Sequence, residues 1–100
     1  MKEIEKPEEV RTPERIRLEE EVKEVAVRLI LRETGYKPRF VMERLDKDMY
    51  DDMGVDSVQM VSILARIETE YDLDISEEDA HKIRTPNDLI RITADYIEDQ

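Results

Sequence analysis

The chain has 100 residues, which is enough for one small domain but not for two independent hydrophobic cores. Its 27 acidic and 16 basic residues give a formal net charge of −11, which makes nucleic acids and anionic membrane surfaces poor partners. The absence of cysteine excludes disulfides, zinc–thiolate sites and thiol catalysis by the chain itself, and it is compatible with a cytoplasmic location.

The first residues predict a charged leader followed by a helix. Residues 1–11 are mostly charged and lack periodicity, so we expect them to be disordered and residues 12–100 to form one helical domain. Thr12 is a typical helix cap, and Gly35 is a typical end of a helix. Between them, the apolar residues of one amphipathic face recur at helical spacing: Leu18, Val22, Val25 and Leu29.

Three apolar residues of this helix, Ile16, Val27 and Leu31, fall on the side opposite the main stripe. We expect the following segment to cover them, with contact to a partner as the alternative. Residues 36–55 show no sustained period and predict a long loop, with a short turn of helix at most.

Three further helices are expected in the second part of the chain. Asp56 and Gln59 form a capping-box pattern at the start of a central helix. Ser76 begins a short third helix and Thr85 a longer fourth one. The fold class predicted is all-α, a small four-helix bundle with three long helices, one short third helix and a long first loop. The central helix carries a broad apolar face, made by Met60, Val61, Leu64, Ile67 and Tyr71.

The sequence offers little catalytic chemistry. His81 is the only histidine, and we expect it inside the short third helix with a structural role. Asp72, Asp74 and Ser76 match the first ligand spacings of an EF-hand loop, but the required glycine and the bidentate acid are missing further along. We therefore expect no enzyme activity, no catalytic residues and no dedicated metal site.

Ser57 is the most informative residue of the chain. It lies in the first turn of the central helix, where unpaired backbone N–H groups and the helix dipole favour an attached phosphate. Gly54, three residues earlier, lets the backbone turn sharply. The alternative is that Asp56 and Ser57 form only a helix cap.

The residues around Ser57 resemble a known signature. Residues 51–58 read D-D-M-G-V-D-S-V, which looks like the D-D-L-G-x-D-S-L motif of acyl carrier proteins. The resemblance extends over residues 16–98 in matching order and spacing. It includes the segment before the motif, the central helix, the exit from that helix and the entry to the last helix, which are residues 45–50, 63–71, 73–76 and 83–90.

This resemblance implies a carrier protein and not an enzyme. Its cofactor would be 4′-phosphopantetheine, which Ser57 would receive from coenzyme A through a phosphodiester bond and whose thiol would hold an acyl group as a thioester. Asp56 and Gly54 would complete the attachment motif. The chain would then present acyl intermediates to enzymes of fatty-acid, polyketide or related biosynthesis.

The resemblance also implies which partners the carrier meets. They would be a pantetheinyl transferase and acyl-processing enzymes with basic patches, and the carrier would act as a cytoplasmic monomer without nucleic acid or membrane. The residues expected to bind partners are Asp52, Asp56, Val58, Gln59, Ser62 and Arg66. The residues expected to line a cleft for the acyl chain are Met60, Val61, Leu64 and Ile67.

One departure from the family pattern concerns the exposed face of the central helix, which is usually rich in acids. Here that face carries Gln59, Ser62, Arg66 and Thr69, which indicates a specialised carrier with dedicated partners. Two alternatives stay open. One is a peptidyl or D-alanyl carrier, and the other is an acidic helical interaction module whose Asp56 and Ser57 serve only as a cap.

Overall fold

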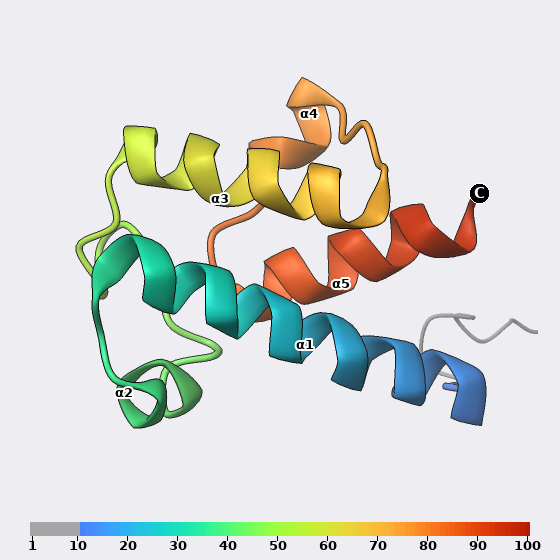
Figure 1. The fold of residues 1–100 in the computed structure, drawn as a ribbon, viewed down its shortest axis with the longest axis horizontal. Helices are drawn as coiled ribbons and strands as arrows, with labels where there is room; N and C mark the ends of the chain where they lie inside the picture. Colours follow the sequence, from blue (N-terminus) through green and yellow to red (C-terminus); the bar gives the residue numbers. More distant parts are fainter. Residues whose placement is uncertain (1–10) are drawn as a thin grey trace, which may run out of the picture.

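The computed structural model describes residues 11–100 and contains five α-helices in that range. They are α1 (Pro13–Thr34), α2 (Pro38–Met42), α3 (Ser57–Tyr71), α4 (Glu77–Ala80) and α5 (Pro86–Glu98), shown in Figure 1. The all-α class is confirmed. The long first loop includes the short helix α2, so the bundle has five helices and not four. The leader expected at residues 1–11 lies outside the described residues, apart from Arg11.

The predicted ends of the first helix are confirmed. The side chain of Thr12 accepts a hydrogen bond of 3.1 Å from the backbone N–H of Arg15. At the other end Gly35 adopts the left-handed conformation, with φ of 76°, and its N–H bonds to the carbonyl of Leu31. A side chain at this φ is strained, so glycine suits the end of α1.

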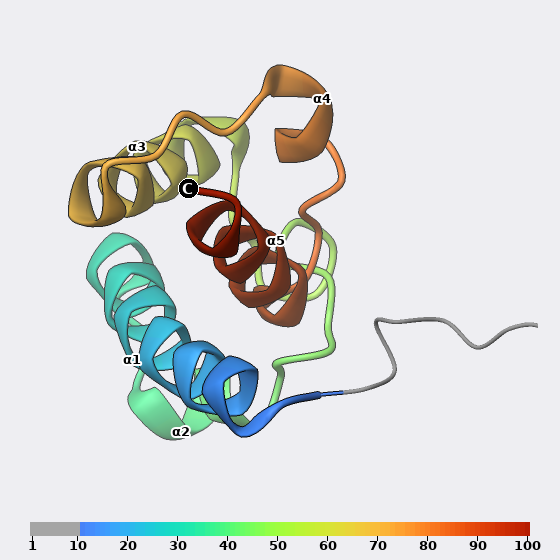
Figure 2. The ribbon, with the colours of Figure 1, turned by 90° about the vertical axis from the view of Figure 1, so that its right-hand side faces the viewer.

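The three long helices enclose an aliphatic core, because α1 packs against both α3 and α5. Figure 2 looks along the bundle and shows the three helices around a common centre. The core takes residues from each of them: Val22, Ala26 and Ile30 from α1, Met60, Ile63 and Ile67 from α3, and Leu89 and Ile92 from α5.

The short helix α2 packs on the side of α1 that faces away from α3, as both views show. It covers two of the three apolar residues expected there, since Val27 is buried and Leu31 is half-buried. The expectation is wrong for Ile16, which remains 42% exposed. Within residues 11–100, no helix combines the length and the apolar character needed to cross a membrane.

Candidate functional site

The loop that leads to α3 is fixed to the core by three buried side chains, those of Met49, Met53 and Val55. The N–H of Val55 donates to the carbonyl of Met49 at 2.9 Å, and the Tyr36 hydroxyl donates to the carbonyl of Met53 at 2.7 Å. These contacts hold the backbone immediately before Ser57 in one conformation.

Arg84 ties the same loop to the segment before α5. Its carbonyl accepts a 2.7 Å hydrogen bond from the N–H of Met49, and its guanidinium donates to Asp48 at 2.7 Å and lies over the ring of Tyr50. Hydrogen bonds from the backbone N–H of Asp51 and from Arg84 hold the pKa of Asp48 below its ordinary value. The loop is therefore held by Tyr36, which follows α1, and by Arg84, which precedes α5.

Gly54 supplies the turn into α3. Its φ is 69°, in the left-handed region that other residues rarely adopt. A Cβ at this position would lie 3.7 Å from the Tyr36 hydroxyl oxygen, which is an ordinary contact. The backbone conformation, and not lack of space, therefore favours glycine here.

The predicted capping box at the start of α3 is confirmed. The Asp56 side chain accepts a 2.8 Å hydrogen bond from the N–H of Gln59, and the Gln59 side chain accepts one of 3.0 Å from the N–H of Asp56. Ser57 and Val58, the first two helical residues, have no carbonyl of an earlier turn to which their N–H groups could bond. The start of α3 therefore keeps unused donors beside Ser57.

The chain has three serines, and their surroundings differ. Ser62 is half-buried and donates to Glu33 at 2.6 Å. Ser76 caps α4, where its oxygen accepts from the N–H of Asp79 and from the hydroxyl of Tyr96. Ser57 is exposed, and its hydroxyl makes no hydrogen bond to residues 11–100. A phosphate-linked group on Ser57 would have both open space and the positive end of the α3 dipole next to it.

Two of the polar residues expected to form an exposed face of α3 are in fact hydrogen-bonded to α1. Gln59 and Ser62 are half-buried, and both bond to Glu33 at the end of α1, Gln59 to its carbonyl at 3.1 Å and Ser62 to its carboxylate. Arg66 is exposed, with its Nε 4.0 Å from the same carboxylate. The expectation of an exposed face is therefore wrong for Gln59 and Ser62, because α1 comes close to this side of α3.

The residues expected to line an acyl-chain cleft divide into two groups. Met60 and Ile67 are buried in the core, and Leu64 is partly buried against it. Val61 is 66% exposed, so its expected place on the buried face is wrong. Together with Val58, which is 78% exposed, Val61 instead forms an apolar surface beside Ser57.

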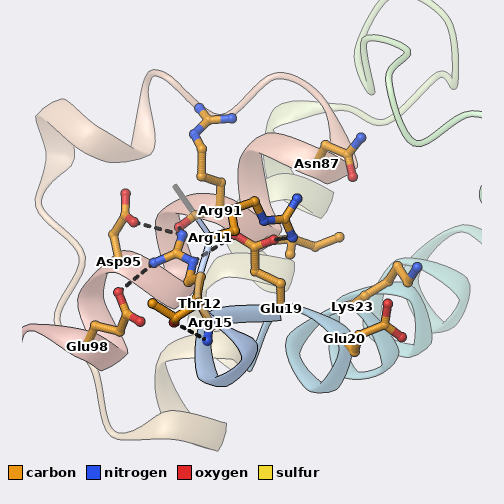
Figure 3. Close-up of a pocket in the computed structure, with 11 residues that line it drawn as sticks. Arg11, Thr12, Arg15, Glu19, Glu20, Lys23, Asn87, Arg91, Asp95 and Glu98 are labelled. Carbon is orange, nitrogen blue, oxygen red and sulfur yellow. Dashed lines mark hydrogen bonds and ion pairs between the residues drawn. The ribbon is translucent and has the colours of Figure 1, made fainter. Parts of the chain in front are cut away.

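A hollow of about 980 Å³ lies between the start of α1 and α5, at the opposite end of the molecule from Ser57. Figure 3 shows Arg15 at its centre, bound to Glu19, Asp95 and Glu98. Burial alone would lower the pKa of Arg15, but the hydrogen bonds to these three carboxylates raise it above its ordinary value. This cluster joins α1 to α5, and it was not foreseen because its members are far apart in sequence.

Residues 11–100 contain no group of three or more histidine, cysteine, aspartate or glutamate side chains arranged to hold a metal ion. His81 is exposed and follows α4 directly, so its expected position inside that helix is off by one residue.

Comparisons with known proteins indicate a family for this chain. The family model described as "Phosphopantetheine attachment site" matches residues 24–92, which include Ser57. An acyl carrier protein from Bdellovibrio bacteriovorus is 34% identical over 70 residues, which amount to 70% of this chain and 82% of that protein.

Proposed function

The chain belongs to the acyl carrier protein family, whose cofactor is 4′-phosphopantetheine, and from this premise we propose that Ser57 is the attachment residue. The protein is a carrier and not an enzyme. When bound, the cofactor supplies a terminal thiol that holds the acyl group as a thioester, which agrees with a chain that has no cysteine. We propose that Asp56 and Gly54 fix the position of Ser57.

The observation that carries the proposal is the exposed hydroxyl of Ser57, which has no hydrogen-bond partner among residues 11–100, whereas the other two serines are engaged by Glu33 or by the α4 cap. In the attachment step, the Ser57 oxygen bonds to the phosphorus of the phosphopantetheine phosphate, and adenosine 3′,5′-bisphosphate leaves. No base among residues 11–100 is hydrogen-bonded to this hydroxyl. The transferase must therefore accept the proton.

We also propose that partner enzymes dock around Ser57. Val58 offers an apolar contact, and the exposed carboxylates of Asp52 and Asp56 offer charge to basic residues. Arg66 is the one exposed cation of α3 and opposes such a basic partner, which supports a specialised carrier with dedicated partners. We propose that the buried side chains of Met60 and Ile67, with Leu64, line the space that an acyl chain enters.

We also propose an acyl load, a location and an oligomeric state for this protein. The acyl load belongs to fatty-acid, polyketide or related biosynthesis, and the protein acts as a cytoplasmic monomer. An aspartate before the serine and the acidity of residues 45–100 favour acyl loads over peptidyl or D-alanyl ones.

The attachment residue is tested with coenzyme A and a broad-specificity pantetheinyl transferase, read by intact-mass spectrometry. We expect the mass of the whole chain to rise by one phosphopantetheine. The Ser57→Ala variant should show no increase, whereas Ser62→Ala and Ser76→Ala should be modified fully. Modification of Ser57→Ala, or a second addition to the unmutated chain, would contradict the proposal.

A further inference from the structure

A groove of about 320 Å³ lies between α1 and α2, on the side of α1 away from α3. Its apolar floor includes Val27, which is buried, and Met42, which is 44% exposed although its side chain is fully apolar. The remaining lining residues are Lys23, Glu24, Arg28, Leu31 and Pro38. The groove is thus an apolar surface that the chain itself covers only in part.

The segment that forms the groove has a charge opposite to that of the rest of the chain. Residues 23–44 contain six basic and three acidic residues, whereas residues 45–100 contain 5 and 16. Of the three acids, Glu43 pairs with Arg39 at 2.9 Å, Glu33 lies at the end of α1 beside α3, and Glu24 lines the groove together with Lys23 and Arg28. The groove lining itself therefore carries a small excess of positive charge, two cations against one acid, within a segment that is also positive.

The cations at the groove are weakly paired. Arg28 comes no closer than 3.9 Å to Glu70, with more than half of its side chain exposed, so this pair adds little stability. For Lys23, the other cation of the lining, the structure gives no ion pair with residues 11–100. These charges are available to an acidic ligand.

We propose that this groove binds an acidic amphipathic helix of a partner protein. Aliphatic side chains of that helix would enter between Val27 and Met42, and its carboxylates would face Lys23 and Arg28. A concave apolar site can receive a side chain that protrudes from a partner protein. Insertion into a lipid surface would instead require an apolar group that protrudes from this protein. The site does not include Ser57, so the proposal does not depend on the proposed attachment residue.

The probe is a synthetic helical peptide with leucines at i, i+3, i+4 and i+7 and glutamates at the other positions. Its control carries lysines in place of the glutamates. Each is titrated into the isotope-labelled full chain, and backbone amide shifts are recorded. We expect the acidic peptide alone to bind, to shift residues 23–42, to bind less at high salt, and to bind Ser57→Ala equally well.

Matched variants locate the site. Met42→Glu should weaken binding of the acidic peptide about tenfold or more, as expected for loss of a central apolar contact. Ile16→Glu should leave it unchanged, because Ile16 is equally exposed but does not line the groove. Lys23→Glu with Arg28→Glu should abolish binding, whereas Arg17→Glu with Lys47→Glu should not.

Four results would overturn the proposal: no binding of the acidic peptide, equal binding of the lysine peptide, equal loss in Ile16→Glu, or shifts confined to α3. Two others would assign the groove to a different occupant and also overturn it. These are self-association of the chain that Met42→Glu removes, and binding to phosphatidylglycerol vesicles that the acidic peptide blocks.

Discussion

The starts of α3 and α5 use the same local device but present different surfaces. Asp56 caps α3 and Thr85 caps α5, and in each helix the third residue returns a hydrogen bond to the cap. The residue after the α3 cap is Ser57, which is exposed and whose hydroxyl bonds to no residue in the described range. The residue after the α5 cap is Pro86, which is fully buried and has no N–H.

The difference comes from the chain that surrounds each start. The N–H of Asn87, in the first turn of α5, donates to the carbonyl of Leu45 at 3.0 Å, so the first loop covers this helix start. Before α3, the same loop turns at Gly54 and leaves Ser57 in the open. A capping box therefore fixes where a helix begins, while the neighbouring loop decides whether that position can be reached.

The sharpest test of this comparison moves the serine. In a Ser57→Ala background, Pro86→Ser places a serine directly after the α5 cap. We expect no phosphopantetheine addition at all to this double variant, because the position is buried and lacks the surroundings of the α3 start. Intact mass after incubation with coenzyme A and the transferase checks this, with circular dichroism to verify folding. Addition at position 86 would show that a cap followed by serine is sufficient.

The two left-handed glycines separate a stability effect from an effect on the site. Gly54→Ala and Gly35→Ala should each lower the free energy of unfolding by about 1–2 kcal/mol, since a Cβ is strained at positive φ and neither site is crowded. Only Gly54→Ala should also slow modification of Ser57, because it alone disturbs the turn before α3. Urea unfolding and the rate of mass increase measure the two effects. An equal rate for both variants would contradict this role of Gly54.

The caps themselves should have similar effects on stability. Asp56→Ala and Thr85→Ala should each reduce the free energy of unfolding by about 1 kcal/mol, because each leaves an N–H of the first turn without its partner. Asp56→Ala should also slow the transferase, and Thr85→Ala should not. A slow rate in both would mean that the loss of stability, and not the position of Ser57, limits the reaction.

The capping residues in the sequence predicted the helix starts well. Which side of α3 is exposed depends instead on tertiary packing. The caps at Asp56 and Thr85 depend on residues three apart, so the sequence shows them directly. By contrast, the exposure of Val61 depends on where α1 and α5 lie relative to α3, which periodicity does not reveal. The same holds for Gln59 and Ser62, whose partner Glu33 is more than 25 residues earlier in the chain.

The third residue of the capping box gives the two helix starts a different response to acid. In α3 it is the neutral Gln59, and in α5 it is Asp88, which accepts hydrogen bonds of 3.0 Å from the N–H groups of Arg84 and Thr85. Burial alone would raise the pKa of Asp88, but these two hydrogen bonds and the nearby Arg91 lower it below its ordinary value.

A carboxyl group whose pKa is lowered by folding stabilises the folded state above its unfolded pKa, about 3.9 for aspartate, and this contribution is lost as the pH falls through the folded value. Asp88→Asn should therefore reduce the free energy of unfolding at pH 7 by somewhat less than the ~1 kcal/mol of a whole cap. The difference from the unmutated chain should shrink in acid, where Asp88 itself becomes protonated. Urea unfolding at pH 7 and in acid, below the folded pKa of Asp88, measures this difference in the free energy of unfolding. Asp74→Asn, at an exposed position, is a control whose free energy of unfolding should differ little from that of the unmutated chain. A difference that persists unchanged in acid would mean that the α5 start depends on the shape of the side chain at position 88 and not on its charge.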